Sequence, residues 1–365
     1  MNDSGPTTPP KAASRRGTDS RVANRFSPLH LEPDPEAESP PDAPATQFLP
    51  DHSATVISRN DSPDLGFEVS LNPYRGCEHG CAYCYARPTH EYLGFSAGLD
   101  FESKIMFKPR APELLARELC APGWQPKWMA LSGVTDPYQP VESRMTITRR
   151  CLEVLAEFRQ PVTIVTKNQL VARDIDLLAI LAEYHAISVY VSITTLDPGL
   201  RSRLEPRTSP PAGRLAAIRA LRKAGIPVGV LTAPIIPGLN DSEIPAILNA
   251  AAEAGASFAS YTLLRLPLAV KPIFLEWLDR AAPLGKNKIL ANLRDVRDGH
   301  LNSSEFGERM RGTGPAAQRL RDWFRISRTR SGLAPRGPEL SSASFQVPPR
   351  VLKSLRESKG QLELF

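Results

Sequence analysis

Between residues 60 and 285 of this 365-residue chain, short apolar runs rich in β-branched residues alternate with longer segments of helical periodicity. Strands separated by helices form βαβ units, and such units build a parallel sheet. The strands are expected at Phe67–Leu71, Trp128–Leu131, Val162–Thr166, Ile187–Thr194, Val228–Ala233 and Ala259–Leu264. The helices are expected at Arg144–Phe158, Ala172–Tyr184, Ala212–Ala224, Glu243–Glu253 and Ile273–Ala281. The pattern predicts an α/β fold, but periodicity leaves open whether the sheet is doubly wound or forms a partial barrel.

The two ends of the chain differ in composition from this middle part. Residues 1–50 hold 10 of the 36 prolines and few large apolar side chains, so they bury too little surface to offset the entropy lost on ordering. We therefore expect residues 1–55 to be a disordered tail, although the basic patch Arg15–Phe26 could dock on the core or on nucleic acid. Pro, Ser and Gly dominate again beyond residue 335. The expected organisation is thus a core over 56–300, a basic extension over 301–335 and a flexible tail over 336–365.

The net charge of +6 resides at the C-terminal end. Residues 301–365 contain 12 Lys and Arg against 6 Asp and Glu, so the rest of the chain is neutral overall. A basic end on a neutral body is typical of a surface that binds nucleic acid, and equally of a solvated tail. The segment Arg319–Arg330 interleaves arginines with Trp323 and Phe324. This pattern suits phosphate pairing with base stacking, and it also suits a helix packed on the core.

Three of the five cysteines lie within eight residues, in the segment NPYRGCEHGCAYCY over residues 72–85. The CxxxCxxC spacing of Cys77, Cys81 and Cys84 supplies three soft thiolate ligands, which suit an iron–sulfur cluster or zinc. A structural zinc normally takes four protein ligands, and His79 in the same tight loop is the one nearby candidate for the fourth. Three ligands to a four-iron cluster would leave one iron open for a substrate or cofactor. Cys151 falls in an expected helix, where a buried apolar role is the ordinary one.

With an aromatic residue before its third cysteine, this motif resembles the cluster loop of the radical S-adenosylmethionine (SAM) superfamily. The segments NPYRGCEHGCAYCYARPTHEYLG, GLDFESKI and SGVTDPYQPVE are similar to its spore-photoproduct-lyase-like, or DNA repair photolyase-like, group. The resemblance covers residues 55–300 and implies a partial (βα)6 TIM-like barrel with a [4Fe–4S] cluster on Cys77, Cys81 and Cys84. It also implies that SAM binds the open iron and is cleaved reductively to a 5′-deoxyadenosyl radical. Such an enzyme needs an electron donor such as flavodoxin or ferredoxin.

The resemblance further implies where SAM binds, because active sites lie at the carboxyl ends of barrel strands. Tyr83 is expected beside the adenine, and Tyr83 and Tyr85 could relay a hydrogen atom. The other cofactor contacts are expected at the ends of successive strands, at Ser132, Gly133, Thr135, Lys167, Ser192, Thr194, Arg203, Ile236 and Gly238. Glu205 could complete a charged contact with Arg203, or the two could be a plain surface pair. Asn240 and Asp241 are expected to cap the following helix.

One departure limits the comparison with spore photoproduct lyases, which carry a cysteine hydrogen donor at the end of the second strand. Residues Leu131–Asp136 include no cysteine, so the thymine-dimer reaction is not implied. Three hypotheses about function stay open. In the first, the chain is a radical SAM enzyme that acts on nucleic acid as a lyase or DNA repair enzyme. In the second, it is a radical SAM enzyme that acts on a protein or small molecule. In the third, it is a non-catalytic, zinc-stabilised binding module.

Targeting signals and cysteine content bear on where the protein is located in the cell. The N-terminus has no apolar segment typical of a signal peptide, and no apolar run approaches 18 residues. The sparse cysteines do not fit a disulfide framework, so we expect a cytoplasmic protein with no membrane partner.

The final pentapeptide resembles the bacterial sliding-clamp-binding motif, and the clamp contacts would be Gln361, Leu362, Leu364 and Phe365.

Overall fold

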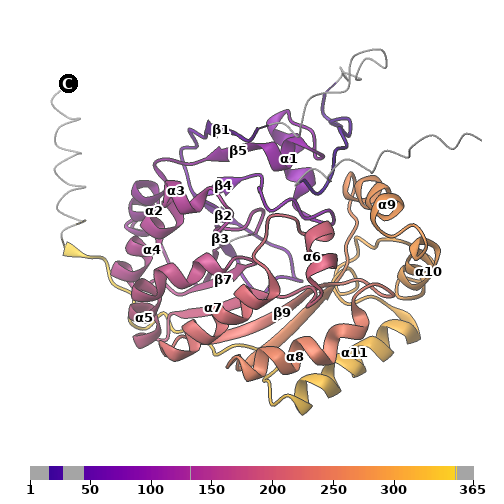
Figure 1. The fold of residues 1–365 in the computed structure, drawn as a ribbon. Helices are drawn as coiled ribbons and strands as arrows, with labels where there is room; N and C mark the ends of the chain where they lie inside the picture. The colour runs from indigo at the N-terminus through magenta and orange to yellow at the C-terminus, as the bar shows by residue number, and fades with distance from the viewer. Residues whose placement is uncertain (1–15, 28–44, 132, 350, 352–365) are drawn as a thin grey trace, which may run out of the picture.

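A curved sheet with helices along its outer face forms the body of the computed structural model, which describes residues 16–27, 45–131, 133–349 and 351 (Figure 1). Its strand order is β10-β9-β8-β7-β6-β3-β2. The strands are β2 (Ile57–Arg59), β3 (Val69–Leu71), β6 (Met129–Leu131), β7 (Val162–Thr166), β8 (Ile187–Ser192), β9 (Val228–Ile235) and β10 (Phe258–Leu263). All neighbouring pairs are parallel except β2 with β3. The six parallel strands are the six that the apolar runs predict.

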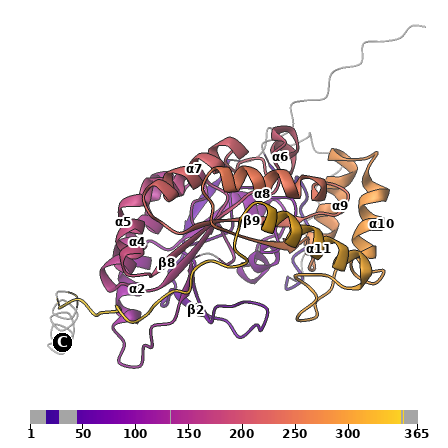
Figure 2. The ribbon, with the colours of Figure 1, turned by 90° about the horizontal axis from the view of Figure 1, so that it is seen from below.

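The strand order decides between the two expected architectures. A doubly wound sheet reverses its order at a switch point, where the crossover helices change face. From β3 to β10 the chain instead adds every strand on the same side of the previous one. Right-handed crossovers then put the longer crossover helices on one face, and the sheet curls away from them (Figures 1 and 2). The predicted partial (βα)6 barrel is confirmed.

The five expected helices are present with local differences, and the described residues also hold helices that the periodicity did not predict. They are α1 (Asp100–Ser103), α2 (Ala111–Leu119), α3 (Glu142–Met145), α4 (Ile147–Phe158), α5 (Ile175–Glu183), α6 (Pro198–Leu204), α7 (Pro211–Lys223), α8 (Ile244–Glu253), α9 (Val270–Ala281), α10 (Lys286–Asp295) and α11 (Gly314–Arg330). The single helix expected over 144–158 is two helices, because Thr146 has a φ of 52°. Cys151 and Leu155 lie one turn apart on the buried face of α4, as the helical periodicity predicts.

A second, small sheet lies across the molecule from α7 and α8 (Figure 1). It consists of β1 (Gln47–Pro50), β5 (Lys104–Phe107) and β4 (Tyr74–Arg75), in that order. The strands β4 and β5 flank the cysteine motif and pair antiparallel, with Tyr74 opposite Phe107. The sequence patterns did not reveal this sheet, because its strands are short and their partners lie far apart in the chain.

The N-terminal segment 16–27 packs against the core instead of belonging to a disordered tail. Asn24 donates hydrogen bonds to the carbonyl oxygens of Glu91 and Phe95, at 2.9 and 3.0 Å. Leu99 donates its backbone N–H to the carbonyl oxygen of Ser20, at 2.8 Å. This corrects the expectation for these residues, since long-range hydrogen bonds replace the apolar burial that the segment lacks.

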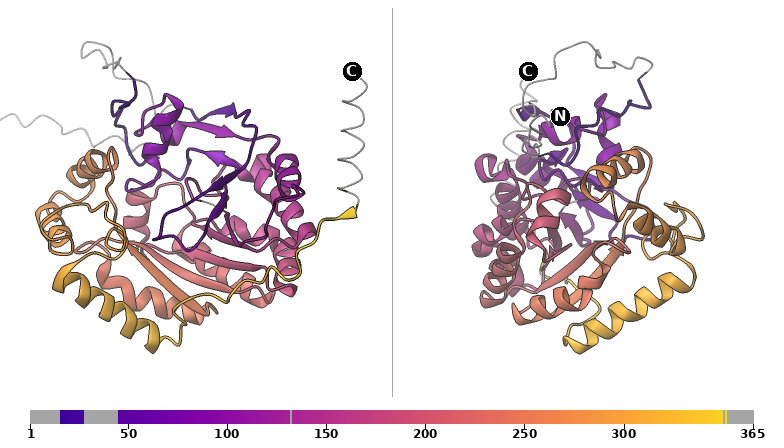
Figure 3. Two further views of the ribbon diagram at one scale, coloured as in Figure 1. Left: turned by 180° about the vertical axis from the view of Figure 1, so that it is seen from behind. Right: turned by 45° about the vertical axis from the view of Figure 1, so that its right-hand side comes forward.

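The C-terminal part of the described chain is likewise integral to the fold. Helix α11 buries Leu320 and Phe324 against the core, and the Phe324 ring lies 4.5 Å from that of Tyr261 in β10. The segment after α11 then runs toward α5 and α2 (Figures 2 and 3). In this segment, Ala334 forms a β-bridge with Phe258. The backbone N–H of Gln346 donates a hydrogen bond to the Phe158 carbonyl oxygen at 3.0 Å. Residues 336–349 therefore depart from the flexible tail expected over 336–365. No helix in the described residues is long and apolar enough to cross a membrane.

Candidate active site

The cysteine motif forms a loop at the carboxyl ends of the barrel strands. Cys77 and Cys81 are buried and Cys84 is partly exposed. Burial and the neighbouring Cys77 thiol raise the pKa of Cys84 to about 11, and burial also raises the pKa of Cys81. The thiols of Cys81 and Cys84 are therefore protonated in the metal-free chain, and a metal cluster would displace their protons.

The geometry of the loop bears on which metal it can hold. Among the described residues, no three His, Cys, Asp or Glu side chains are grouped around one point in the way that a single ion requires. A four-iron cluster binds each cysteine through a different iron, so its ligands do not have to converge on one point. The three soft, mutually close thiols fit such a cluster.

Two buried polar side chains hold the loop in place. Gln139 donates to the Gly76 carbonyl at 3.2 Å and accepts from the Glu78 backbone N–H at 2.8 Å. Arg87, fully buried and ion-paired with Glu102, donates to the Cys81 carbonyl at 2.9 and 3.1 Å. Sequence reasoning missed Gln139 and Arg87. The sequence signal that could have indicated them is their position: Arg87 lies in CYARPTH, directly after the cysteine motif, and Gln139 lies in the segment SGVTDPYQPVE.

His79 is held by an ion pair and does not serve as a fourth ligand candidate in this geometry. Its Nδ1 lies 3.3 Å from Oδ2 of Asp136. Burial by itself would lower the pKa of His79, but Asp136 and Cys77 raise it to about 10, so the ring is charged. Asp136 also accepts from the Thr166 hydroxyl and the Lys167 backbone N–H, both at 2.7 Å. This carboxylate therefore ties the cysteine loop to the end of β7.

A fully buried carboxylate, Glu205, joins the cysteine loop to the end of β8 and to α7. It accepts hydrogen bonds from Thr194, at 2.6 Å, and from Tyr83, and it pairs with Arg214. Burial opposes its ionisation, but Arg214 and Lys167 outweigh this and lower the pKa of Glu205 to about 2. Glu205, not Arg203, is thus the charged residue that contacts Tyr83 and Thr194.

Lys167 stands beside this carboxylate. Its Nζ donates to Ser192 Oγ at 2.7 Å and to the Ala233 carbonyl at 3.1 Å, and lies 3.8 Å from Glu205 Oε1. The Thr194 hydroxyl oxygen lies 3.0 Å from the same Ala233 carbonyl oxygen. The structure therefore brings together four of the expected cofactor residues, at Tyr83, Lys167, Ser192 and Thr194.

The other expected residues lie at varying distance from this group. Gly133 accepts a 2.7 Å hydrogen bond from the half-exposed Tyr85, and Thr135 donates to the Gly76 carbonyl at 2.7 Å. Ile236 is buried in the same apolar cluster as Tyr83 and Cys81. Arg203 is exposed on α6, away from the group. Ser132 lies outside the described residues.

The turn after β9 corrects one expectation about helix capping. Asn240 does not cap the following helix; its side chain donates to the Thr194 carbonyl at 2.8 Å and accepts from the Ile236 N–H at 2.7 Å. Gly238 donates its N–H to Asp241 at 2.8 Å. Asn240 therefore braces the ends of β8 and β9 against each other.

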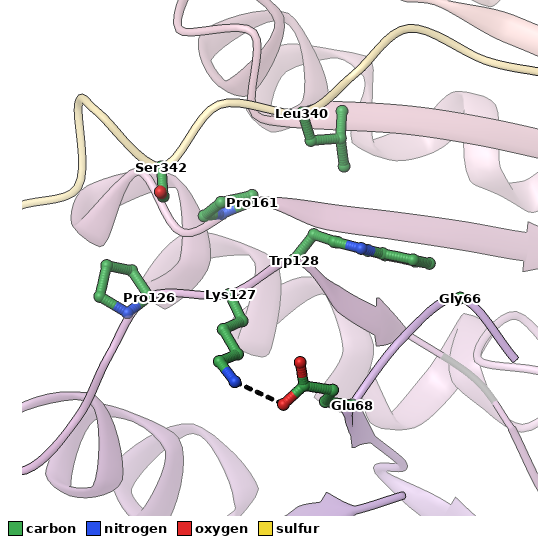
Figure 4. Close-up of a pocket in the computed structure, with 8 residues that line it drawn as sticks. All are labelled: Gly66, Glu68, Pro126, Lys127, Trp128, Pro161, Leu340 and Ser342. Atoms are coloured by element: carbon green, nitrogen blue, oxygen red, sulfur yellow. Dashed lines mark hydrogen bonds and ion pairs between the residues drawn. The ribbon is translucent and has the colours of Figure 1, made fainter. Parts of the chain in front are cut away.

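A surface pocket lies at the opposite, amino-terminal end of the strands (Figure 4). Its lining includes Trp128 and Pro161, which precede β6 and β7, and the ion pair of Lys127 with Glu68. Leu340 and Ser342 of the C-terminal segment border it. Because barrel active sites form at the carboxyl ends, this pocket is separate from the candidate site.

Comparisons with known proteins agree with this geometry. Residues 71–251 match the family model described as the radical SAM superfamily. An uncharacterized protein of Mycobacterium tuberculosis is 40% identical over 221 residues, covering 60% of this chain and 65% of that protein. An uncharacterized protein of Methanocaldococcus jannaschii is 29% identical over 178 residues, covering 49% of this chain and 64% of that protein. The chain thus spans just under two thirds of the length of these relatives.

Solved structures of spore photoproduct lyase share the fold. The complex of that enzyme with dinucleoside spore photoproduct has a TM-score of 0.57 at 16% identity, covering 78% of this chain and 80% of that one. A mutant with bound AdoMet and the same dinucleoside has a TM-score of 0.55 with the same identity and coverage. The resemblance inferred from the cysteine motif is confirmed: residues 71–251 form a domain of the radical SAM superfamily.

Proposed function

We propose that this chain is a radical SAM enzyme that acts on nucleic acid, with a [4Fe–4S] cluster held by Cys77, Cys81 and Cys84. The observation that carries the proposal is the position of the three thiols beside the group formed by Lys167, Ser192, Thr194 and Tyr83. Both lie at the carboxyl ends of one barrel, joined by the buried carboxylate of Glu205.

The chain's own residues would bind and orient the cofactor. A reduced cluster held there would supply the one electron that cleaves SAM into methionine and a 5′-deoxyadenosyl radical. Lys167, with its ammonium partly exposed, offers a cation for the carboxylate of the methionine part. Ser192 and Thr194 offer hydroxyls at the positions expected for the ribose, and buried Ile236 and Tyr83 offer apolar surface for the adenine. The docked N-terminal segment and the Arg87–Glu102 pair shield the loop from water.

Two features support a nucleic acid as the substrate. Helix α11 carries Arg319, Arg325 and Arg330 on its exposed face, together with the part-exposed Trp323. Spore photoproduct lyase, which shares the fold, has been solved with a dinucleoside photoproduct bound. Phe324 is packed on Tyr261, so only Trp323 of the two aromatics is free to stack on a base.

The hydrogen donor would differ from the cysteine of spore photoproduct lyases. Cys120 directly follows α2 and Cys151 lies on α4, both outside the cysteine loop. Tyr83 is engaged with Glu205, whereas Tyr85 is half-exposed directly after Cys84. We therefore favour Tyr85 over Tyr83 as the residue that relays a hydrogen atom.

The decisive experiment is anaerobic reconstitution followed by assay of 5′-deoxyadenosine release with dithionite, with and without DNA or RNA. A brown protein whose release of 5′-deoxyadenosine rises with one nucleic acid supports the proposal. A colourless protein that holds only zinc would overturn it. Release that responds to neither DNA nor RNA would leave a radical SAM enzyme but reject the nucleic-acid substrate.

A partner is proposed for the last five residues, which lie outside the described part of the chain. Their similarity to the clamp-binding motif suggests that Gln361, Leu362, Leu364 and Phe365 attach the enzyme to the bacterial sliding clamp. Such an attachment would bring a nucleic-acid enzyme to DNA.

A further inference from the structure

Two arginines gather at the carboxyl end of β10, next to the cysteine loop. Arg265 follows the strand, and its guanidinium carbon lies 5.6 Å from the centre of the Tyr85 ring. Arg297 follows α10 and donates to the Leu264 carbonyl at 2.5 Å and the Arg309 carbonyl at 3.1 Å. The pair therefore stands on the side of the loop that carries Tyr85.

Arg297 is buried with part of its guanidinium unused. Arg297 is only 3% exposed, yet its Nε and Nη1 have no hydrogen-bond partner among the described residues. Nε of Arg265 is likewise unpaired within the described chain, and its Nη1 has only the Met310 sulfur, at 3.9 Å. Buried cationic groups without partners are costly, so such donors are usually kept for a ligand.

The nearby acid does not neutralise these two groups. Asp64 accepts from Arg309 Nε and, at 2.6 Å, from the Gly307 N–H. Within the described residues, Asp64 forms its ion pair with Arg309 and none with Arg265 or Arg297. Burial and the charge of Arg265 lower the pKa of Arg297 to about 10, which still leaves it protonated at neutral pH. The cluster has a surplus of positive charge and of unused N–H donors.

We propose that Arg265 and Arg297 form a subsite that binds a phosphate group of the substrate. Guanidinium groups present paired N–H donors that match phosphate oxygens, and two of them suit one phosphate. Tyr85 links the subsite to the cysteine loop, because its ring contacts Arg265 while its hydroxyl bonds to Gly133. This inference rests on the proposed function and narrows it, since it places a phosphate of the substrate beside the residue after Cys84.

The test is binding of a fluorescent DNA oligonucleotide to the full reconstituted chain, measured by anisotropy over a range of salt. Arg265→Gln is expected to weaken binding about tenfold and to reduce the salt slope by about one. Arg297→Lys, which keeps the charge but not the paired donors, is expected to weaken binding as well. Arg219→Gln, an exposed change on α7, is the control with the same loss of charge.

Competition with thymidine monophosphate, thymidine and inorganic phosphate identifies the source of the phosphate. Competition by the monophosphate but not by thymidine supports the subsite, and loss of that competition in Arg265→Gln locates it. If DNA does not bind but the monophosphate does, and Arg265→Gln abolishes that binding, the subsite stands and the nucleic-acid substrate is rejected. If folded Arg265→Gln and Arg297→Lys bind every probe like the wild type, the subsite is wrong while the proposed function survives. Absence of binding to every probe also overturns the subsite.

Discussion

A Cβ atom on Gly17 would stand 1.7 Å from the carbonyl oxygen of Gly80, so the N-terminal segment touches the backbone of the cysteine loop. Gly80, between Cys77 and Cys81, has a φ of 66°, a conformation that favours glycine. The Gly17 N–H donates to Glu102 at 2.9 Å, and its carbonyl accepts from Arg280 at 3.0 Å. The segment therefore covers the loop, and the two are in contact through their backbones.

This contact predicts that Gly17→Ala exposes the cluster. The added methyl group forces either the segment or the loop to move, at a cost of about 1–3 kcal/mol. We expect the reconstituted variant to lose iron to a chelator several times faster than the wild type. Gly123→Ala, at a glycine with open space around it, is the matched control. Equal rates of iron loss in Gly17→Ala and wild type would contradict the cover.

The cysteines divide into ligands and packing residues. Alanine at Cys77, Cys81 or Cys84 is expected to abolish cofactor cleavage, because the cluster loses a thiolate ligand. Cys151→Ala removes a buried sulfur from α4 and should cost about 1 kcal/mol while iron content stays unchanged. Iron analysis, visible absorbance and 5′-deoxyadenosine release measure these outcomes. A full cluster after joint replacement of Cys77 and Cys84 would refute the ligand set.

Glu205 makes the free energy of unfolding of the metal-free chain depend on pH in the acid range. Its pKa is lowered from an ordinary value of 4.5 to about 2, so the unfolded chain takes up this proton first as the pH falls. The contribution of Glu205, about 3 kcal/mol, is present above pH 4.5 and is lost as the pH falls toward 2. We expect Glu205→Gln to be strongly destabilised at pH 7, with Arg214 left as a buried unpaired charge.

Denaturant unfolding of wild type and Glu205→Gln at pH 7, 4.5 and 3 checks this prediction. The difference in unfolding free energy between the two proteins should shrink at the lowest pH. A difference that is constant over this range would show that folding does not lower the pKa of this carboxyl group.

The exposed arginines of α11 are expected to add general affinity for nucleic acid. Replacing Arg319, Arg325 and Arg330 by Gln should weaken binding of any DNA sequence and lower the salt slope by about three. Anisotropy titrations at several salt concentrations give both quantities. Binding that is indifferent to salt would favour a protein or small-molecule substrate.

The last residues of the chain are expected to bind the sliding clamp weakly. A peptide covering Lys359–Phe365 should bind with Leu364 and Phe365 as apolar anchors, and their replacement by Ala should abolish binding. Calorimetry with the purified clamp measures this. Unchanged clamp binding of a full chain that lacks Gln361–Phe365, or no binding by the intact chain, would refute the attachment.

Much of the barrel could be predicted from the sequence because its signals are local. The strands of a parallel sheet are buried on both faces, so β7, β8 and β9 read as continuous apolar runs. The spacing of Cys77, Cys81 and Cys84 is local in the same sense. Lys167, Ser192 and Thr194 were found because the carboxyl ends of parallel strands meet at one end of the barrel.

The sequence by itself therefore determined the α/β class, the cysteine motif and the strand ends that surround it. Only the tertiary structure decided the central place of Glu205, the cover formed by residues 16–27 and the unpaired donors of Arg297. Each of these depends on contacts between residues far apart in the chain, such as Gly17 with Gly80 and Tyr83 with Glu205. Such contacts leave no periodicity or composition bias in the segments that make them, because one buried hydrogen bond or ion pair needs only one residue on each side.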